Sequence, residues 1–139
     1  MTPDIALQRA VGGALVATSG VVQHVSPLSI LAGTVRPSDL PGITMAPAKV
    51  EILGRASGGY VVTEVRMMLH IWTDAKQGAI ARQITSAAML ALMDAPRAQG
   101  CTIEEWDRPA MAWVPDPDPA MSFAHAAINL RAVIYWRAS

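Results

Sequence analysis

YVVTEVRMMLHIWT, residues 60–73, alternates between two kinds of side chain along its whole length. Successive side chains of a strand point to opposite faces of a sheet, so this pattern predicts one β-strand. At 3.3 Å per residue the strand would reach roughly 45 Å, which is long for a small domain, so we expect a hairpin arm or a bulged strand. One face holds Val61, Thr63, Val65, Met67, Leu69 and Ile71, and the other holds Tyr60, Val62, Glu64, Arg66, Met68, His70 and Trp72.

The residues before this strand predict its hairpin partner. Residues 48–53 alternate in the same way, and Gly54–Gly59 interrupts the pattern. A short connection that contains glycine, placed between two alternating runs, is typical of an antiparallel hairpin. Because Ser57, Gly58 and Gly59 have little to pack against and much backbone entropy to lose, we expect the loop from Arg55 to Gly59 to be mobile in an isolated subunit.

Two helices are predicted from their capping signals and apolar spacing. Thr2-Pro3-Asp4 is a typical helix start, and the apolar residues that follow recur at helical spacing, which predicts a helix over about 3–18 that ends at Ser19-Gly20. Thr73 or Asp74 can cap a second helix over about 76–93. Its predicted buried face comprises Ile80, Ile84, Ala87, Ala88, Ala91 and Leu92.

The remaining segments complete the predicted fold class. Residues 20–47 are rich in proline and glycine and predict a long irregular connection or short edge segments. Residues 101–106 and 111–114 predict strand pieces broken at Pro109, and residues 121–136 alternate again and predict a long last strand. We therefore expect a single α+β domain over residues 1–139, with an antiparallel sheet of about four strands in two hairpins and two helices packed on one face.

The amino-acid composition excludes some functional classes and favours others. The 139 residues carry 11 Lys and Arg against 11 Asp and Glu, which argues against a free-standing nucleic-acid binder. Only 16% of residues are charged and 52% are apolar, a balance that fits a subunit burying surface against others. The uncharged stretch from Ala10 to Val35 is interrupted by polar residues and prolines, so it predicts neither a membrane span nor a signal peptide.

Residues able to do chemistry are present without a catalytic pattern. His24, His70 and His125 lack the spacing of metal ligands, and the single Cys101 excludes an intramolecular disulfide and fits a packed position. We expect the acidic residues to be solvated or to lie between subunits, because alternation separates Glu104 from Glu105 and turn chemistry explains the Asp-Pro-Asp-Pro segment; they are Glu104, Glu105, Asp107, Asp116 and Asp118. The residues thus predict no catalytic, cofactor or metal site.

The tryptophans are more informative. Trp72, Trp106, Trp113 and Trp136 lie at or near the predicted strand ends. Tryptophan is enriched at protein interfaces, although core packing is the expectation for about half of these four. Those that are exposed in an isolated subunit would mark an assembly surface.

Several segments resemble one protein family. Leu69-His70-Ile71-Trp72-Thr73, then Gly78, the helix from Ile80 to Leu92 and its stop Met93-Asp94-Ala95-Pro96 are similar to the strand-to-helix core of tail completion, or tail terminator, proteins of long-tailed bacteriophages and gene transfer agents. The segments 46–54 and 116–118 and the N-terminal helix are also similar. Ala46 departs from the family's usual aromatic residue, and the loop from Ser26 to Pro47 is longer than expected.

The resemblance implies a structural role. It implies a non-enzymatic subunit, without cofactor, that forms a ring, expected to be a hexamer, at the head-proximal end of the tail tube. Its partners would be other copies of itself, the tail tube protein and the head-side connector protein. DNA would pass through the lumen as cargo, no membrane would be involved, and the protein would be assembled in the bacterial cytoplasm and reside in the virion tail or neck. The expected interface residues are Arg55, Ser57, Gly58, Gly59, Trp72, Trp106, Trp113 and Trp136, with the 55–59 loop ordered or lumen-facing in the ring.

Two other functions remain open at this stage. The first is another structural subunit, either a different head–tail connector or a tube-like protein. The second is a small α+β ligand-binding protein or enzyme, with His70, His125, Glu104 or Cys101 lining a pocket on the sheet. Two of these side chains in one buried pocket would favour the second function, and wide separation would exclude it.

Overall fold

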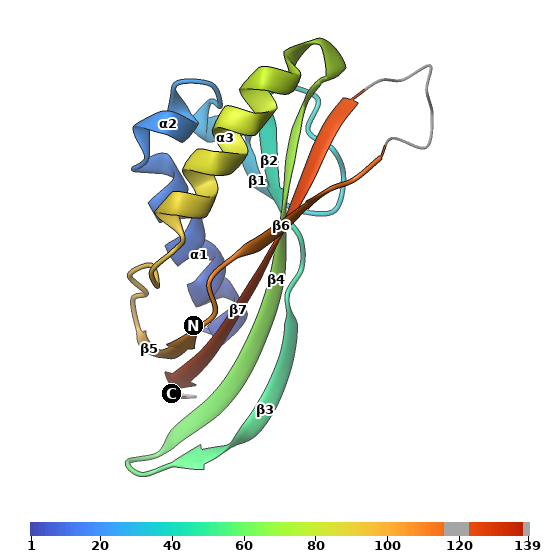
Figure 1. Ribbon diagram of the computed structural model, residues 1–139. Helices are drawn as coiled ribbons and strands as arrows, with labels where there is room; N and C mark the ends of the chain where they lie inside the picture. The colour runs from blue at the N-terminus through green and yellow to red at the C-terminus, as the bar shows by residue number, and fades with distance from the viewer. Residues whose placement is uncertain (116–122, 138–139) are drawn as a thin grey trace.

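Two long antiparallel strands form the middle of the sheet in the computed structural model, which describes residues 1–115 and 123–137 (Figure 1). They are β4 (Tyr60–Asp74) and β7 (Phe123–Trp136), and the whole of β7 pairs with residues 61–74 of β4. The sheet order is β1-β2-β4-β7-β5, with β3 also on β4 and β6 also on β7. The other strands are β1 (Ile30–Ala32), β2 (Gly42–Met45), β3 (Lys49–Ala56), β5 (Cys101–Trp106) and β6 (Ala110–Trp113).

The class α+β is confirmed, whereas the predicted number of strands is too low. The described residues form a seven-stranded sheet because each neighbour of the central pair is broken in two and β1 adds a further strand outside β2. β2 and β3 lie along the same edge of β4 with Pro47 between them, and β5 and β6 lie along β7 with Pro109 between them. Proline cannot donate to the ladder, so each edge strand is interrupted there. The expectation of a wholly antiparallel sheet is also wrong, since β1 pairs with β2 in parallel.

The helices cover one face of the sheet (Figure 1). They are α1 (Pro3–Val16), the single turn α2 (Ser19–Val22) and α3 (Gly78–Ala91). The predicted first helix ends two residues early because Thr18 is extended, and Ser19-Gly20, expected to stop it, instead opens α2. A Cβ on Gly20 would lie 2.9 Å from the Cβ of Ala87, so glycine lets α2 approach α3. None of the helices in the described part of the chain is both long and apolar enough to cross a membrane.

The second helix also begins differently from its prediction. The 3-10 turn Ala75–Gln77 precedes α3, and the Asp74 side chain caps that turn by accepting a hydrogen bond from the Lys76 amide at 3.4 Å. The segment expected to be an irregular loop over 20–47 contains α2, the 3-10 turn Pro27–Ser29, β1 and β2. Its apolar residues therefore help to build the core and the sheet edge as well as the connection.

The alternation of residues 60–73 is confirmed by burial. On β4 the side chains of Thr63, Val65, Met67, Leu69 and Ile71 are buried under the helices. The matching inward positions of β7 are buried as well, among them Ile128, Leu130 and Ile134. The other sheet face has no helix over it among the described residues, and the hairpin of β3 and β4 extends beyond the helical layer (Figure 1).

Candidate assembly surface

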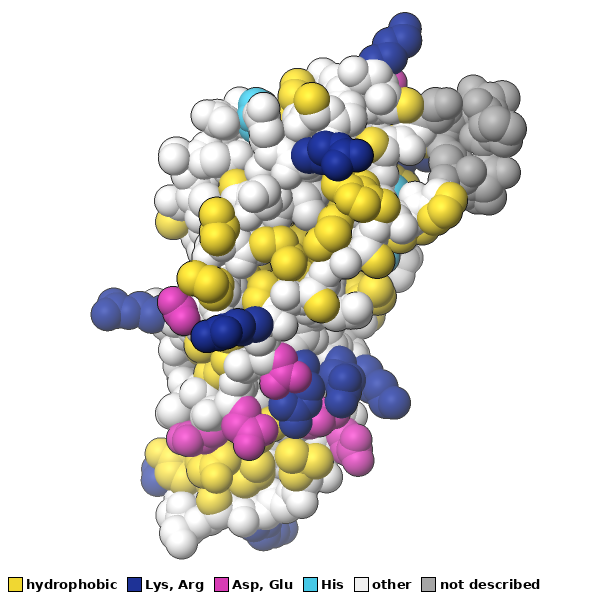
Figure 2. All heavy atoms as spheres, viewed as in Figure 1, with side chains coloured by type: hydrophobic (Ala, Val, Ile, Leu, Met, Phe, Trp, Pro, Cys, Tyr) yellow, Lys and Arg dark blue, Asp and Glu magenta, His cyan; other side chains and the backbone are white. Residues whose placement is uncertain are grey.

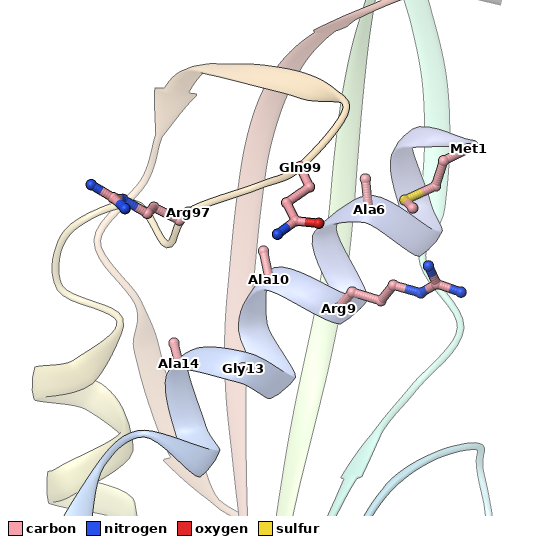
Figure 3. A pocket seen from close by; sticks show the side chains of 8 residues that line it. All are labelled: Met1, Ala6, Arg9, Ala10, Gly13, Ala14, Arg97 and Gln99. Atoms are coloured by element: carbon pink, nitrogen blue, oxygen red, sulfur yellow. The ribbon is translucent and has the colours of Figure 1, made fainter.

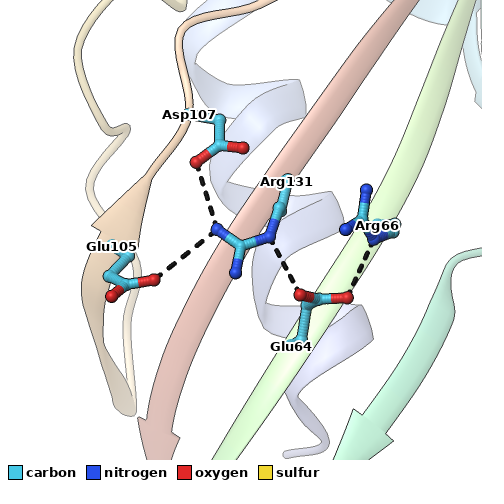
Figure 4. Close-up of polar contacts among 5 residues, drawn as sticks. All are labelled: Glu64, Arg66, Glu105, Asp107 and Arg131. Atoms are coloured by element: carbon cyan, nitrogen blue, oxygen red, sulfur yellow. Dashed lines mark hydrogen bonds and ion pairs between the residues drawn. The ribbon is translucent and has the colours of Figure 1, made fainter.

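A band of charged side chains crosses the middle of the helix-free sheet face. Glu64 accepts from Nε of Arg66 at 2.8 Å and from Nε of Arg131 at 2.9 Å, while Nη1 of Arg131 lies 3.1 Å from Asp107 and 3.5 Å from Glu105 (Figure 4). The hydrogen bonds from Arg66 and then Arg131 hold the pKa of the Glu64 carboxyl below its usual range. The network links β4 and β7 to Glu105 of β5 and to Asp107, which follows that strand.

The strand register explains why this network forms. Lys49, Arg66 and Arg131 lie directly opposite one another on β3, β4 and β7, and Glu51 lies opposite Glu64 one row further along. Like charges directly opposite each other repel, whereas oppositely charged neighbours on adjacent rows attract. Figure 2 shows the resulting band of charged side chains. Hydrophobic side chains over α3 and β6 lie above this band, and a second hydrophobic group lies below it, at the lower end of the sheet.

The β3–β4 arm exposes apolar side chains that no helix covers. Val50, Ile52 and Leu53 of β3 are 43%, 67% and 51% exposed. Val50 and Ile52 lie opposite Val65 and Thr63, so they lie on the helix side of the sheet. Monomeric proteins rarely expose several neighbouring apolar side chains, so β3 is a candidate contact surface.

The loop predicted as an interface forms the end of this arm. Arg55 is the penultimate residue of β3, and Ser57, Gly58 and Gly59 form the turn that leads into β4. Gly58 and Gly59 have φ values of +86° and +79°, a region that other residues enter at a cost. All four residues are placed at a projecting end of the subunit, and their role as an interface stays a prediction.

The four tryptophans have different surroundings. Trp106 and Trp136 pack against the core, and their indole N–H groups donate to the Leu92 carbonyl and to Thr63, both at 2.8 Å. Trp72 is partly buried and donates to Thr44 at 3.2 Å. Trp113 is 42% exposed, with the Arg82 guanidinium 5.5 Å from its ring centre. Exposure therefore makes Trp113 the strongest interface candidate of the four.

The structure brings together two histidines that the sequence could not pair. His70 Nδ1 and His125 Nε2 are 2.8 Å apart, and the Trp72 ring stacks on His125 with centroids 3.7 Å apart. Burial lowers the pKa of His70. The β4–β7 register creates the pair across 55 residues, and the only hint in the sequence is that both histidines occupy the more polar faces of two long strands. His24 lies elsewhere and contacts Gln83 at 3.0 Å.

The chemistry candidates on β5 lie far from this pair. Cys101 lies opposite Trp136, eleven residues along β7 from His125, which is roughly 36 Å at the usual rise of a strand. Burial raises the pKa of the Cys101 thiol. The expected alternation of Glu104 and Glu105 is interrupted by a bulge between Ile103 and Glu105. Asp116 and Asp118 lie outside the described residues.

A cavity of about 470 Å³ lies beside α1 (Figure 3). Its lining comes from α1 and from the segment before β5, and it includes no histidine, cysteine or carboxylate among the described residues. The described residues also contain no group of three or more His, Cys, Asp or Glu side chains that could hold a metal ion. The lining residues are Met1, Ala6, Arg9, Ala10, Gly13, Ala14, Arg97 and Gln99.

Comparison with known proteins identifies the family. Residues 9–135 match the family model described as tail completion protein gp17. The chain belongs to this family. The match confirms the resemblance to tail completion proteins that residues 69–96 of the sequence showed.

A solved structure shares the fold. This tail completion protein superposes with a TM-score of 0.71 and 19% identity on a chain from the virion of a native gene transfer agent particle, covering 97% of this chain and 99% of that one. No curated protein sequence matches the chain.

Proposed function

We propose that this chain is a structural virion protein that forms a ring and terminates a tail. The ring caps the head-proximal end of the tail tube and joins it to the head-side connector, and DNA passes through the lumen. Membership of the tail completion family over residues 9–135 carries the proposal. The shared fold with a chain of a gene transfer agent virion supports it, because almost the whole of both chains superposes.

The physical properties of the subunit also support an assembly role. Few of its residues are charged, and apolar side chains of β3 are exposed to solvent. The projecting β3–β4 arm offers contact area away from the body of the subunit. Cys101 lies opposite Trp136 near the far end of β7 from His125, so the cysteine and the histidine pair do not share one pocket. A ring arises when one surface of a subunit binds a different surface of the next and the rotation closes.

The test is the state of assembly with and without the tail tube protein. The purified chain is measured by light scattering alone and after mixing with tube protein, and the mixtures are viewed by negative-stain electron microscopy. We expect a closed multimer, or a monomer that assembles only on tubes, together with tubes that stop growing and carry a cap at one end. A chain that stays monomeric at high micromolar concentration and leaves tube length unchanged would contradict the proposal.

The same experiment distinguishes the related structural roles. A tube-like subunit would co-polymerise along the whole tube, and a different connector protein would bind the head side without stopping tube growth. Electron microscopy of the mixtures separates the three outcomes, because a terminator is found only at tube ends.

A further inference from the structure

The sheet has two open edges at the same level. β3 is paired only with β4 among the described residues, and β5 only with β7. The register places residues of the four strands β3, β4, β7 and β5 side by side in rows across the sheet. One row is Ile52, Thr63, Ile134 and Ile103, and another is Arg55, Val61, Trp136 and Cys101. This end of the sheet is thus a four-stranded ribbon with β3 at one edge and β5 at the other.

The strand directions allow two copies to join without a break. β3, β4, β7 and β5 are each antiparallel to the next, so β3 and β5 run in opposite directions. When a second copy is added side by side in the same orientation, its β3 lies antiparallel to β5 of the first. An unpaired edge of backbone N–H and C=O groups is a template for such pairing.

The side chains of the two edges match on both faces. On the helix side, the exposed Ile52 of one copy would lie beside the partly buried Ile103 and Cys101 of the next. On the other face, β3 presents the exposed Lys49, and the β5 edge presents Glu105 and Asp107, whose carboxylates are 63% and 56% exposed. Apolar side chains therefore meet apolar ones, and an ammonium group meets carboxylates.

The strand register sets the position of these charges along the two edges. Lys49 lies in the same row as Arg131, and the carbonyl of Arg131 accepts a hydrogen bond from the Asp107 amide at 3.1 Å, so Lys49 and Asp107 lie at the two ends of one row. A copy joined without stagger brings Lys49 to Asp107 and leaves Glu51 opposite Glu105. Closed sheets are staggered, and a shift of two residues brings Lys49 opposite Glu105 and separates the two glutamates.

Each edge also carries a bulge. The register shifts at Leu53 in β3 and at Glu104 in β5. Bulges bend a strand and increase its twist, which makes open-ended stacking of flat edges difficult and gives a sheet the curvature that closure needs.

We infer that β3 of one copy pairs with β5 of the next copy, so that the proposed ring is held by a β-sheet continued from subunit to subunit. This inference rests on the proposed function, because it names the contact that closes the ring. The partner is a second copy of this chain.

The chain's single cysteine makes this contact testable by cross-linking. Cys101 lies at the β5 edge, so a cysteine introduced at the β3 edge by Ile52→Cys, Arg55→Cys or Ser57→Cys would approach Cys101 of the neighbouring copy. The three positions cover different staggers. After assembly with tube protein and mild oxidation, we expect a ladder of covalent multimers on a non-reducing gel for at least one of them, and its loss when Cys101→Ser is added.

Two controls accompany the ladder. Leu28→Cys places an exposed cysteine on the 3-10 turn before β1, away from both edges, and should give no ladder above the wild-type background. In a charge exchange, Lys49→Glu and Glu105→Lys should each weaken assembly at low salt, and the double variant should recover it. Circular dichroism of each variant excludes loss of folding as the cause.

The outcomes separate this inference from the proposed function. Capped tubes with no ladder from any of the three positions and no effect of charge exchange would overturn the β3–β5 contact and leave the ring intact. No capping by the wild-type chain would contradict the ring itself. A ladder that ends at one size, with charge exchange restoring assembly, would support both.

Discussion

β2 and β3 pair with the same edge of β4, yet their environments are opposite. All four residues of β2 are buried, whereas no residue of β3 is. β2 has β1 on its outer side and contributes Ile43 and Met45 to the core, while β3 extends past the helices with nothing outside it among the described residues. Only Ala46, Pro47 and Ala48 separate the two strands.

The difference shows that alternation defines a strand without defining what covers it. Ile43 and Ile52 both occupy positions on the helix side of the sheet, opposite Ile71 and Thr63. One is fully buried and the other is two-thirds exposed. In a protein that works in an assembly, a strand of the second kind is a natural place for contact between copies.

The largest expected effect comes from a matched pair of truncations. Ile43→Ala should lower the free energy of unfolding by about 2–5 kcal/mol, because it removes a fully buried side chain and leaves a cavity. Ile52→Ala should lower it by less than about 1 kcal/mol, because that side chain is largely in water. Urea denaturation of both variants measures the contrast, and equal losses would show that the two strands are not so different in the free subunit.

The second prediction adds a methyl group to β2. A Cβ on Gly42 would lie 2.7 Å from Cγ of Pro37 and 3.0 Å from the Asp39 carbonyl oxygen, so Gly42→Ala should cost about 1–3 kcal/mol of stability. Pro37→Ala in the same chain should recover part of the loss.

A glycine with free space around it is the control for that substitution. An added Cβ on Gly13 of α1 would have no atom of another segment within 4 Å, and Gly13→Ala should be neutral or stabilising by up to about 1 kcal/mol, since alanine favours helix. Thermal unfolding of the variants distinguishes the clash from any general effect of the methyl group.

The third prediction concerns pH and the charged band beside β3. The folded pKa of Glu64 lies below its ordinary value of 4.5, so the unfolded chain takes up the proton more readily. The stabilisation is therefore present above about pH 4.5 and is lost as the pH falls through the folded pKa. Denaturation between pH 6 and 3 should show a shallower loss for Glu64→Gln than for the wild type.

Glu51 provides the matched control for Glu64. It lies in the same row on β3 and has no ion pair among the described residues. Glu51→Gln keeps the contacts of Glu64 with Arg66 and Arg131, so its acid slope should stay steeper than that of Glu64→Gln. The same flattening from both substitutions would argue against the specific role of the Arg66 and Arg131 contacts.

The smallest expected effect is at the β2 end of the sheet. His70 lies opposite Thr44 of β2, and burial lowers its pKa. Because the unfolded chain then binds a proton more readily than the folded chain, the fold loses stability as the pH falls below about 6.5. His70→Gln should reduce the dependence of the melting temperature on pH between 7 and 5. A steeper dependence in the variant would contradict this sign.

Much of the fold follows from local patterns. The alternation of residues 60–73 and the glycine-containing break at 54–59 predicted the β3–β4 hairpin, although β3 continues through Gly54 to Ala56. The candidate caps Thr73 and Asp74 and the apolar spacing after them predicted α3, although Asp74 caps the 3-10 turn that precedes it. The breaks at Pro47 and Pro109 could be expected from the missing proline amide. β1 could not, because three residues in a proline-rich segment carry no period and form a strand only by pairing with β2.

The residues of the candidate assembly surface were harder to predict from the sequence than the fold. Trp106 and Trp136 resemble Trp113 in the sequence, but only the tertiary structure partly buries the first two with bonded N–H groups and leaves the third exposed. The bulge at Glu104 likewise depends on the pairing with β7.

By itself, the sequence determined the long strands, the two main helices and the resemblance to the family, because side-chain period, caps and motif spacing are properties of neighbouring residues. Only the tertiary structure decided the strand register and which strand the helices cover. Those two choices join His70 to His125 across 55 residues and place β3 and β5 at opposite edges of one ribbon. Register and coverage are set by contacts between distant segments, whose energies depend on how the whole sheet packs, so no local pattern encodes them.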